Sequence, residues 1–328
     1  MVQVIIVNIN YLNNGDNMII EEKVTIKNDI SIGATISYLD KNKKSPLILL
    51  IMGTGTTDRD GNIKNFKTDF YKNLSDIFVK NGYVCIRYDK RGTHESTGNY
   101  KTAGLFDLVN DSANVIDYAK NLKYVDKNKI IVCGHSEGAM IATLLTKIRN
   151  VNGLILLGGA CTCMKSALIY QNCLVLDKFE NKKGLLAWYI RKILTKEKIN
   201  KQFNDLFEKA SKSSKERYFF NGGLFNTKYM KEHGSLTNAD FINILKAYNG
   251  NILAITGTSD LSADYTTLNE ISDLKNATIY TPQNVNHILR EIDDNNDIMK
   301  AKKQYKRLCK NPIHKETLDK ILKWLNEF

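Results

Sequence analysis

The residues best suited to chemistry lie mid-chain, in the stretch Gly134-His135-Ser136-Glu137-Gly138. The apolar run Ile130–Cys133 before it predicts a buried strand, and the apolar residues after it predict the start of a helix. A Gly-x-Ser-x-Gly sequence between a strand and a helix is typical of a nucleophile elbow, a sharp turn that exposes the serine hydroxyl. The glycines are needed because the backbone is crowded on both sides of the serine. Ser136 is therefore the candidate nucleophile.

A serine nucleophile needs a base, and the base needs a carboxylate that orients it. After such an elbow the acid follows the serine, and the histidine comes last. Of the five histidines, His287 alone follows the last predicted strand in a loop, so it is the candidate base. Asp260 directly follows the predicted strand at 252–256 and its turn, and is the candidate acid. Asp264 is the alternative acid.

Hydrolysis at this serine would also need two donors for the oxyanion that forms on the substrate. The backbone N–H of Glu137, directly after the serine, is the first candidate donor. The second is expected from Thr54, in the loop Gly53-Thr54-Gly55 after the predicted strand at 47–52. A plain tight turn is the alternative interpretation of that loop.

The elements that would position these residues alternate between strands and helices. Two segments with alternating polarity, 22–27 and 34–39, predict an antiparallel pair of strands. The later strands alternate with helical segments, which predicts an α/β fold with a doubly wound, mostly parallel sheet. The candidate residues lie at the carboxyl ends of strands, where such sheets bind ligands. The buried strands are predicted at 47–52, 83–88, 130–133, 154–157, 252–256 and 277–280.

This alternation stops between residues 160 and 250, where the sequence predicts amphipathic helices and no clear strand. We interpret this segment as a helical cap inserted into a core made of 18–159 and 251–328, with 1–17 as an N-terminal extension. Contact with a membrane surface is the alternative for the basic amphipathic helix in the segment. The aromatic residues expected to bind substrate from the cap are Trp188, Tyr189, Phe219, Phe220 and Phe225.

Composition restricts the classes of function. The chain of 328 residues is 43% hydrophobic and 25% charged, which is typical of a globular protein. The formal net charge is +12, but the lysines are scattered, which favours a solvated surface over a nucleic-acid site. No apolar run approaches the length of a membrane span, so stable membrane insertion is not expected.

The six cysteines favour a reducing, cytoplasmic compartment over a disulfide framework. Cys85 and Cys133 fall in predicted buried strands, where a cysteine serves as a small apolar residue. The group Cys161, Cys163 and Cys173 lacks both Cys-x-x-Cys spacing and a nearby histidine. We therefore expect no metal and no other cofactor.

Several motifs together resemble those of the bacterial α/β-hydrolases, in the acyl-esterase branch related to serine aminopeptidases. The resemblance extends from about residue 20 to the C-terminus and is weakest in the segment 160–250. The motifs that carry it are Gly53–Gly61, Tyr88–Gly92 with Ser96–Gly98, Gly134–Gly138, Gly257–Asp260 and Asn286-His287.

The resemblance implies the α/β-hydrolase fold, with Ser136 as nucleophile, Asp260 as acid and His287 as base. It also implies Thr54 and Glu137 as oxyanion donors.

One departure is Met52, which stands where the family usually has a histidine before the oxyanion loop. A methionine cannot make the polar contacts of that histidine, so the rigidity of the loop is in question. The donor is a backbone N–H, so the hole can still form. Asp89 and Arg91 are interpreted as a charged pair that fixes loops near the site, with substrate binding by Arg91 as the alternative.

Three functions are compared on these grounds. The first is a serine esterase that cleaves small to medium acyl esters through an acyl-enzyme on Ser136. Its partner would be a small-molecule ester substrate, and a homodimer is left open. The second is an amidase or peptidase, which would need acidic groups in the cap to hold a substrate amine. The third, a binding protein, is expected to have lost a triad member, yet all three are present in order. The acidic cap residues available to a peptidase show no evident clustering: Glu180, Glu197, Asp205 and Glu208.

Overall fold

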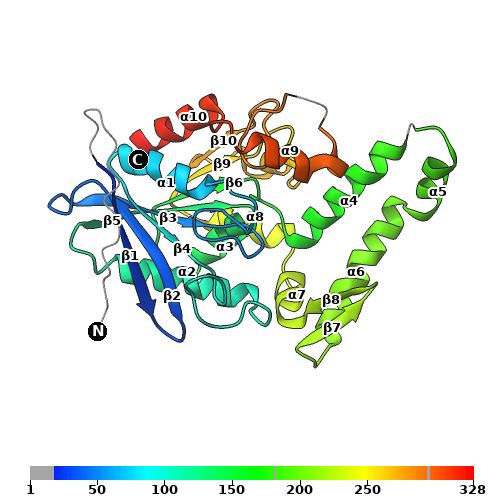
Figure 1. Cartoon of the computed structure of the whole chain (residues 1–328), viewed down its shortest axis with the longest axis horizontal. Helices are drawn as coiled ribbons and strands as arrows, with labels where there is room; N and C mark the ends of the chain where they lie inside the picture. The colour runs from blue at the N-terminus through cyan, green and yellow to red at the C-terminus, as the bar shows by residue number, and fades with distance from the viewer. Residues whose placement is uncertain (1–17, 181, 294–295) are drawn as a thin grey trace.

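A twisted eight-stranded sheet forms the centre of the computed structural model, which describes residues 18–180, 182–293 and 296–328 (Figure 1). The strand order is β1-β2-β4-β3-β5-β6-β9-β10. The β1–β2 and β2–β4 pairs are antiparallel, and the remaining pairs are parallel. The predicted α/β fold with a mostly parallel sheet is confirmed, while the predicted extension at 1–17 lies outside the described residues. The strands are β1 (Ile20–Lys27), β2 (Ser31–Tyr38), β3 (Ser45–Ile51), β4 (Val84–Tyr88), β5 (Val125–His135), β6 (Gly153–Leu157), β9 (Asn251–Ile255) and β10 (Ala277–Tyr280).

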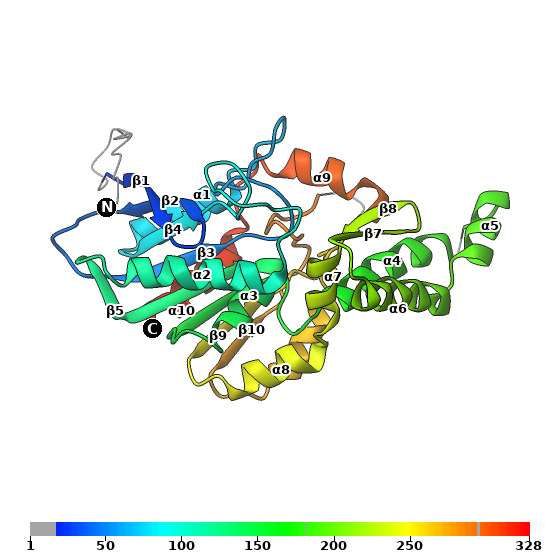
Figure 2. The same ribbon diagram turned by 90° about the horizontal axis from the view of Figure 1, so that it is seen from below.

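Helices cover both faces of the sheet, which explains why its central strands are continuous apolar runs (Figure 2). Along β3, Leu49 joins the core cluster under α2, α3 and α8, whereas Leu50 joins the cluster under α1 and α10. Successive side chains of a strand point to opposite faces, so each face needs its own apolar set. The helices of this domain are α1 (Phe70–Lys80), α2 (Leu105–Ala119), α3 (Glu137–Leu145), α8 (Asn238–Ala247), η1 (Tyr265–Ile271), η2 (Ile298–Lys300), α9 (Ala301–Leu308) and α10 (Lys315–Asn326).

Most of the chain between β6 and β9 extends from one end of the sheet as a cap, on the right in Figure 1. The cap has a small core of its own, in which Phe203, Phe207 and Met230 are buried. The last helix of the segment, α8, instead packs on the main core through Phe241 and Leu245. The cap elements are α4 (Met164–Glu180), α5 (Leu185–Ile193), α6 (Lys196–Lys212), β7 (Arg217–Phe220), β8 (Gly223–Asn226) and α7 (Thr227–Gly234).

The hairpin β7–β8 corrects the prediction of a purely helical cap. Phe220 pairs with Gly223 across a two-residue turn, Asn221-Gly222. Both turn residues have positive φ, 43° and 83°. Asn-Gly is the preferred sequence for this hairpin turn, because both residues tolerate the left-handed region. The signal was present in the sequence, but the adjacent helical periodicity obscured it.

Other expectations concern the chain as a whole. In the part of the chain that the structure describes, no helix is both long and apolar enough to cross a bilayer. All six cysteines are free thiols.

Candidate active site

The nucleophile elbow lies between β5 and α3. Ser136 has φ 57° and ψ −122°, a strained conformation for a residue with a side chain. The turn is held by the N–H of Ser136, which donates to the carbonyl of Leu157 on β6 at 2.8 Å. A Cβ on Gly134 would lie 2.1 Å from the carbonyl oxygen of Gly138, and a Cβ on Gly138 equally close to the carbonyl oxygen of Ile51. Both glycines are therefore required by close backbone contacts.

The candidate acid and base meet in the loops that follow β9 and β10. The His287 Nδ1 atom lies 2.8 Å from Oδ2 of Asp260. The Asp260 side chain is buried. The other carboxylate oxygen of Asp260 accepts hydrogen bonds from the N–H groups of Ser262 and Ala263, at 2.7 and 3.0 Å. The alternative acid, Asp264, is instead the N-cap of η1. The structure thus brings Asp260, and not Asp264, against His287.

The two candidate oxyanion donors lie beside Ser136, and Thr54, Glu137 and Ser136 line one pocket. The N–H of Glu137 is the first of α3, a position where a helix offers it no internal acceptor. The loop that carries Thr54 passes close to the serine, since a Cβ built on Gly53 would lie 3.0 Å from Ser136 Cβ.

Three side chains hold the oxyanion loop, which answers the question raised by Met52. The N–H of Gly53 donates to the Tyr71 hydroxyl at 2.9 Å, and the carbonyl of Gly53 accepts from Lys90 Nζ at 2.6 Å. The N–H of Gly55 donates to the Tyr100 hydroxyl at 3.2 Å. The loop is therefore fixed through its backbone by tyrosine and lysine side chains.

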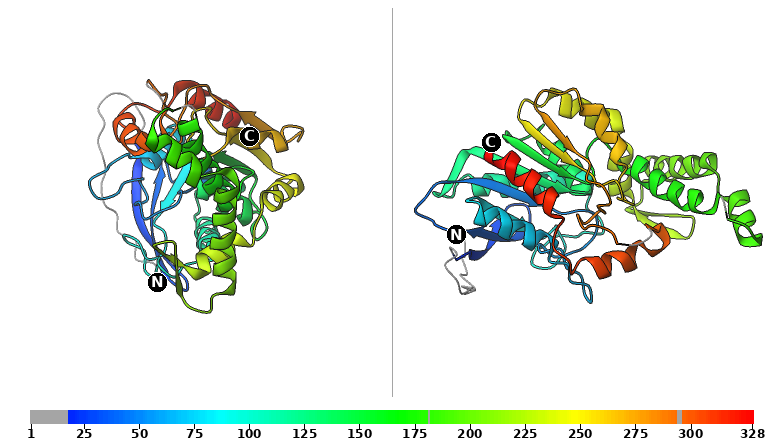
Figure 3. Two further views of the ribbon diagram at one scale, coloured as in Figure 1. Left: turned by 90° about the vertical axis from the view of Figure 1, so that its right-hand side faces the viewer. Right: turned by 90° about the horizontal axis from the view of Figure 1, so that it is seen from above.

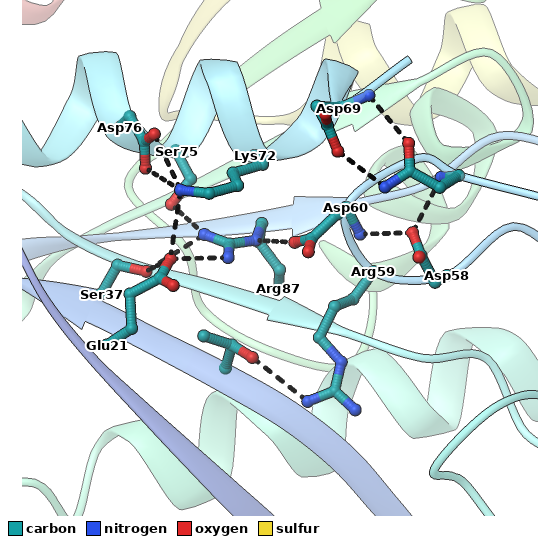
Figure 4. A network of polar contacts seen from close by, with 12 residues as sticks. Glu21, Ser37, Asp58, Arg59, Asp60, Asp69, Lys72, Ser75, Asp76 and Arg87 are labelled. Carbon is teal, nitrogen blue, oxygen red and sulfur yellow. Dashed lines mark hydrogen bonds and ion pairs between the residues drawn. The ribbon is translucent and has the colours of Figure 1, made fainter. Parts of the chain in front are cut away.

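Farther along the same loop, ion pairs attach residues 58–60 to the sheet. The buried Arg87 of β4 donates to Asp60 at 2.9 Å and to Glu21 of β1 at 2.9 Å (Figure 4). The Arg59 guanidinium binds Asp89, with Nε 3.1 Å from Oδ2.

The predicted ion pair between Asp89 and Arg91 is wrong. Asp89 binds Arg59, whereas Arg91 binds Asp111 at 2.6 Å and Asp29 at 3.3 Å. Both residues still anchor loops, but with different partners. The reason is that the buried Asp89 carboxylate is already bound by the backbone N–H and guanidinium of Arg59 and by the N–H of Glu95.

His135, which precedes the nucleophile, links the oxyanion loop to the loop of the candidate base. Its Nε2 lies 2.8 Å from the carbonyl oxygen of His287, and its Nδ1 lies 3.0 Å from the Tyr71 hydroxyl. A carbonyl can only accept, so Nε2 carries the proton and the Tyr71 hydroxyl donates to Nδ1. Burial first, and then the neighbouring His287 ring, lower the pKa of His135 to about 3, so its ring is neutral at pH 7.

The Glu137 carboxylate lies in a buried polar cluster. It accepts from Lys90 Nζ at 2.7 Å and from the Tyr229 hydroxyl, and it lies 3.3 Å from His233 Nε2. Burial alone would raise the pKa of Glu137, but Lys90 and His233 hold this pKa well below its ordinary value. The cluster joins β4 and α3 to α7 of the cap.

These supporting residues were missed from the sequence. Tyr71, Lys90 and Tyr229 act through contacts between distant segments, so no local spacing marks them. The one available signal was Lys90, a charged residue two positions after the predicted buried strand at 83–88.

The pocket between the cap and the sheet has a volume of about 660 Å³. Ser136 and His287 open into it from the sheet side. Most of its cap side is apolar. The apolar lining residues include Met140, Met164, Leu168, Phe203, Leu206, Leu224 and Met230.

Of the aromatic cap residues expected at the substrate, Phe220 and Phe225 line this pocket. The structure places the other three on the surface, which corrects their expected position. Phe219 is 62% exposed because neighbouring side chains of β7 point to opposite sides. Trp188 and Tyr189 lie on the solvent-facing side of α5.

Comparison with known proteins supports this fold. The model of the serine aminopeptidase family, S33, matches residues 65–221, which include the elbow. The chain has the α/β-hydrolase fold. No curated protein matches the chain in sequence.

Solved structures share the fold of this α/β-hydrolase at low sequence identity. Est1E from Butyrivibrio proteoclasticus, solved with ferulic acid, is 19% identical with a TM-score of 0.54, over 86% of this chain and 96% of that one. The esterase Pf2001 from Pyrococcus furiosus is 12% identical with a TM-score of 0.54, over 94% and 92% of the two chains. A thioesterase domain from the curacin biosynthetic pathway is 14% identical with a TM-score of 0.50, over 89% and 99%. At these identities the likeness concerns the fold.

Proposed function

We propose that this α/β-hydrolase is a serine esterase that cleaves carboxylic esters of small to medium acyl chains through an acyl-enzyme on Ser136. The observation that carries the proposal is the convergence of the elbow serine and the Asp260–His287 pair on one pocket. The pocket volume of about 660 Å³ falls in the range of roughly 300–1,000 Å³ that small-molecule sites occupy.

The proposed mechanism assigns each group a role that its contacts support. Asp260 accepts the Nδ1 proton of His287, which leaves Nε2 as the base for the Ser136 hydroxyl. The Ser136 oxygen attacks the ester carbonyl, and His287 then returns the proton to the leaving alcohol. The N–H groups of Thr54 and Glu137 stabilise the oxyanion in both halves of the reaction. Water activated by His287 releases the acid and restores the serine.

The lining of the pocket favours an ester over the alternative, a peptide with a free amine. Of the residues described, Glu137 is the only acidic side chain that lines the pocket, and its carboxylate is already bound by Lys90 and Tyr229. The cap carboxylates that a peptidase could use are absent from the described lining: Glu180, Glu197, Asp205 and Glu208. A buried ammonium group would have no counter-charge there, which is costly.

The test is a substrate panel of p-nitrophenyl acetate, butyrate and octanoate against aminoacyl p-nitroanilides. We expect kcat/KM for the esters to be at least about 100-fold above that for the anilides, because the amine of an aminoacyl anilide would be buried in the pocket without a counter-charge. A preference for the aminoacyl anilides would instead assign the chain to the peptidases. Absence of turnover on every substrate, together with absence of labelling by a fluorophosphonate, would leave a binding protein.

A further inference from the structure

The helix α5 lies at the far tip of the cap, away from the sheet in Figures 1 and 2 and in the right-hand view of Figure 3. Its attachment to α4 is fixed, because Arg191 Nη1 donates to the carbonyls of Phe179 and Lys182, each at 2.7 Å. The helix therefore holds a defined orientation at the end of the molecule.

The apolar stripe of α5 faces solvent rather than the cap. Ala187 is buried, and Ile190 and Arg191 are half-buried on the inner side. The outer side collects residues at helical spacing, so they share one face. Its apolar members are Leu185, Trp188, Tyr189 and Ile193, with exposed fractions of 86%, 55%, 54% and 48%.

The chain segment that contains this stripe is strongly basic. The twenty residues from 182 to 201 contain seven lysines or arginines and one acid, Glu197, so they carry +6 of the formal net charge of +12. Lys192 lies on the same outer face, with its Nζ 5.2 Å from the centroid of the Trp188 ring. The exposed lysines of this stretch are Lys182, Lys183 and Lys192 beside or on α5, and Lys196, Lys198 and Lys201 on α6, of which Lys201 pairs with Asp205.

We propose that the outer face of α5 binds the surface of an anionic phospholipid bilayer. Exposed leucine, isoleucine, tryptophan and tyrosine beside lysines are the chemistry of a helix that lies in the membrane interface. The aliphatic members at both ends, Leu185 and Ile193, distinguish this face from a platform that stacks nucleic-acid bases, which is built from aromatic rings. The proposal is independent of the esterase assignment, since it concerns attachment rather than chemistry.

The test measures binding of the full chain to vesicles by flotation, with phosphatidylcholine alone and with phosphatidylcholine mixed with phosphatidylglycerol. We expect binding to the mixed vesicles that weakens at high salt, because the lysines attract the anionic leaflet. Leu185→Asp combined with Trp188→Asp should weaken this binding by about 100-fold, since two apolar anchors are lost. Lys183→Glu with Lys192→Glu should weaken it by at least about tenfold.

A matched control tests whether position matters as well as charge. Lys127→Glu with Lys129→Glu makes the same change in net charge on the exposed part of β5, at the opposite end of the molecule. This variant should keep most of the binding. If it loses as much as Lys183→Glu with Lys192→Glu, binding follows net charge alone and the assignment to α5 is overturned. Circular dichroism of each variant checks that the chain is folded.

Tryptophan fluorescence provides a second readout. The chain has two tryptophans, and Trp324 is buried in the core, so a blue shift on adding vesicles reports Trp188. Trp188→Phe should still float with the mixed vesicles but lose the blue shift. The absence of both flotation and blue shift would overturn the proposal. A fluorescence response to single-stranded DNA without a response to vesicles would also overturn it. The same holds if the chain binds no vesicles but self-associates, and Leu185→Asp with Trp188→Asp abolishes that self-association.

Discussion

At the scale of single residues, the site depends on one serine in a strained conformation. The elbow was predictable because its two glycines are demanded by local backbone contacts, which leave a spacing in the sequence. The positions of the candidate acid and base were also predictable, since both lie in loops that follow strands of a sheet whose order of elements could be anticipated. Their closest support was not predictable, because Tyr71 and Lys90 reach Gly53 from other elements of the fold.

The first prediction concerns Ser136. Ser136→Ala should lower kcat for p-nitrophenyl butyrate by about 10⁴-fold or more, because triad members act as a unit. A fluorophosphonate should label the wild type on the peptide that contains residue 136. Ser262→Ala, which removes another serine of the same pocket, should remain labelled. A labelled Ser136→Ala variant would exclude this serine as the nucleophile.

The second prediction compares two aspartates. Asp260→Asn should lower kcat by up to about 10⁴-fold, because an amide favours the wrong tautomer of His287. Asp264→Asn should have a much smaller effect, since the Asp264 carboxylate caps η1 by accepting from Thr266. Both variants replace a carboxylate by an isosteric amide, so each is the control of the other. A larger loss in Asp264→Asn would overturn the choice of acid.

At the scale of elements, hydrogen bonds join the loops after β3 and β10 through α1 and the last residue of β5. Gly53 donates to Tyr71, Tyr71 donates to His135, and His135 donates to the backbone of His287. The chain of bonds links the loop of Thr54 to the candidate base through the residue before the candidate nucleophile. His135, the neighbour of Ser136 in the elbow, therefore helps to position both the loop of Thr54 and the loop of His287.

The third prediction tests this support with Tyr71→Phe. The change leaves the Gly53 N–H and His135 Nδ1 without their buried partner, so the free energy of unfolding should fall by about 1–3 kcal/mol. Displacement of the oxyanion loop should lower kcat by about tenfold or more with little change in KM. Tyr83→Phe is the matched control, because the buried Tyr83 hydroxyl donates to Leu325 at the other end of the sheet. Tyr83→Phe should lower the free energy of unfolding but leave kcat unaltered. Equal kcat values in the Tyr71 and Tyr83 variants would contradict a role of Tyr71 in positioning the loop of Thr54.

The fourth prediction follows from the lowered pKa of His135, about 3 in the folded chain. The unfolded chain takes up this proton near the ordinary value of about 6.5, so stability present above that pH is lost as pH falls toward 3. The loss should reach about 1.4 kcal/mol per pH unit from this group. Urea unfolding of His135→Gln across the same pH range should lack this contribution. A variant that keeps the wild-type slope would show that another group carries it.

At the scale of the whole molecule, the sheet was predictable and the cap only partly. Buried parallel strands leave continuous apolar runs, and these runs predicted β3, β4, β5, β6, β9 and β10. The cap elements leave no such pattern, because its helices and hairpin contact one another across the chain, as the Tyr218 hydroxyl of β7 does in donating to the carbonyl of Leu206 on α6. An amphipathic pattern also does not say which neighbour its apolar side meets. For α5 the apolar side meets solvent, so Trp188 and Tyr189 were assigned to the wrong surface.

The last prediction uses two neighbours on β7 whose side chains point to opposite sides. Phe220 lines the pocket, whereas Phe219 faces solvent, so the two alanine variants remove the same ring from different environments. Phe220→Ala should change the ratio of kcat/KM for p-nitrophenyl octanoate to that for p-nitrophenyl acetate by about tenfold, the effect of one or two lost apolar contacts. Phe219→Ala should leave this ratio near the wild-type value, and so should Trp188→Ala. Equal shifts in the Phe219 and Phe220 variants would mean that the hairpin acts on the rate through cap stability, whereas a shift confined to Phe220 ties acyl-chain preference to the cap wall.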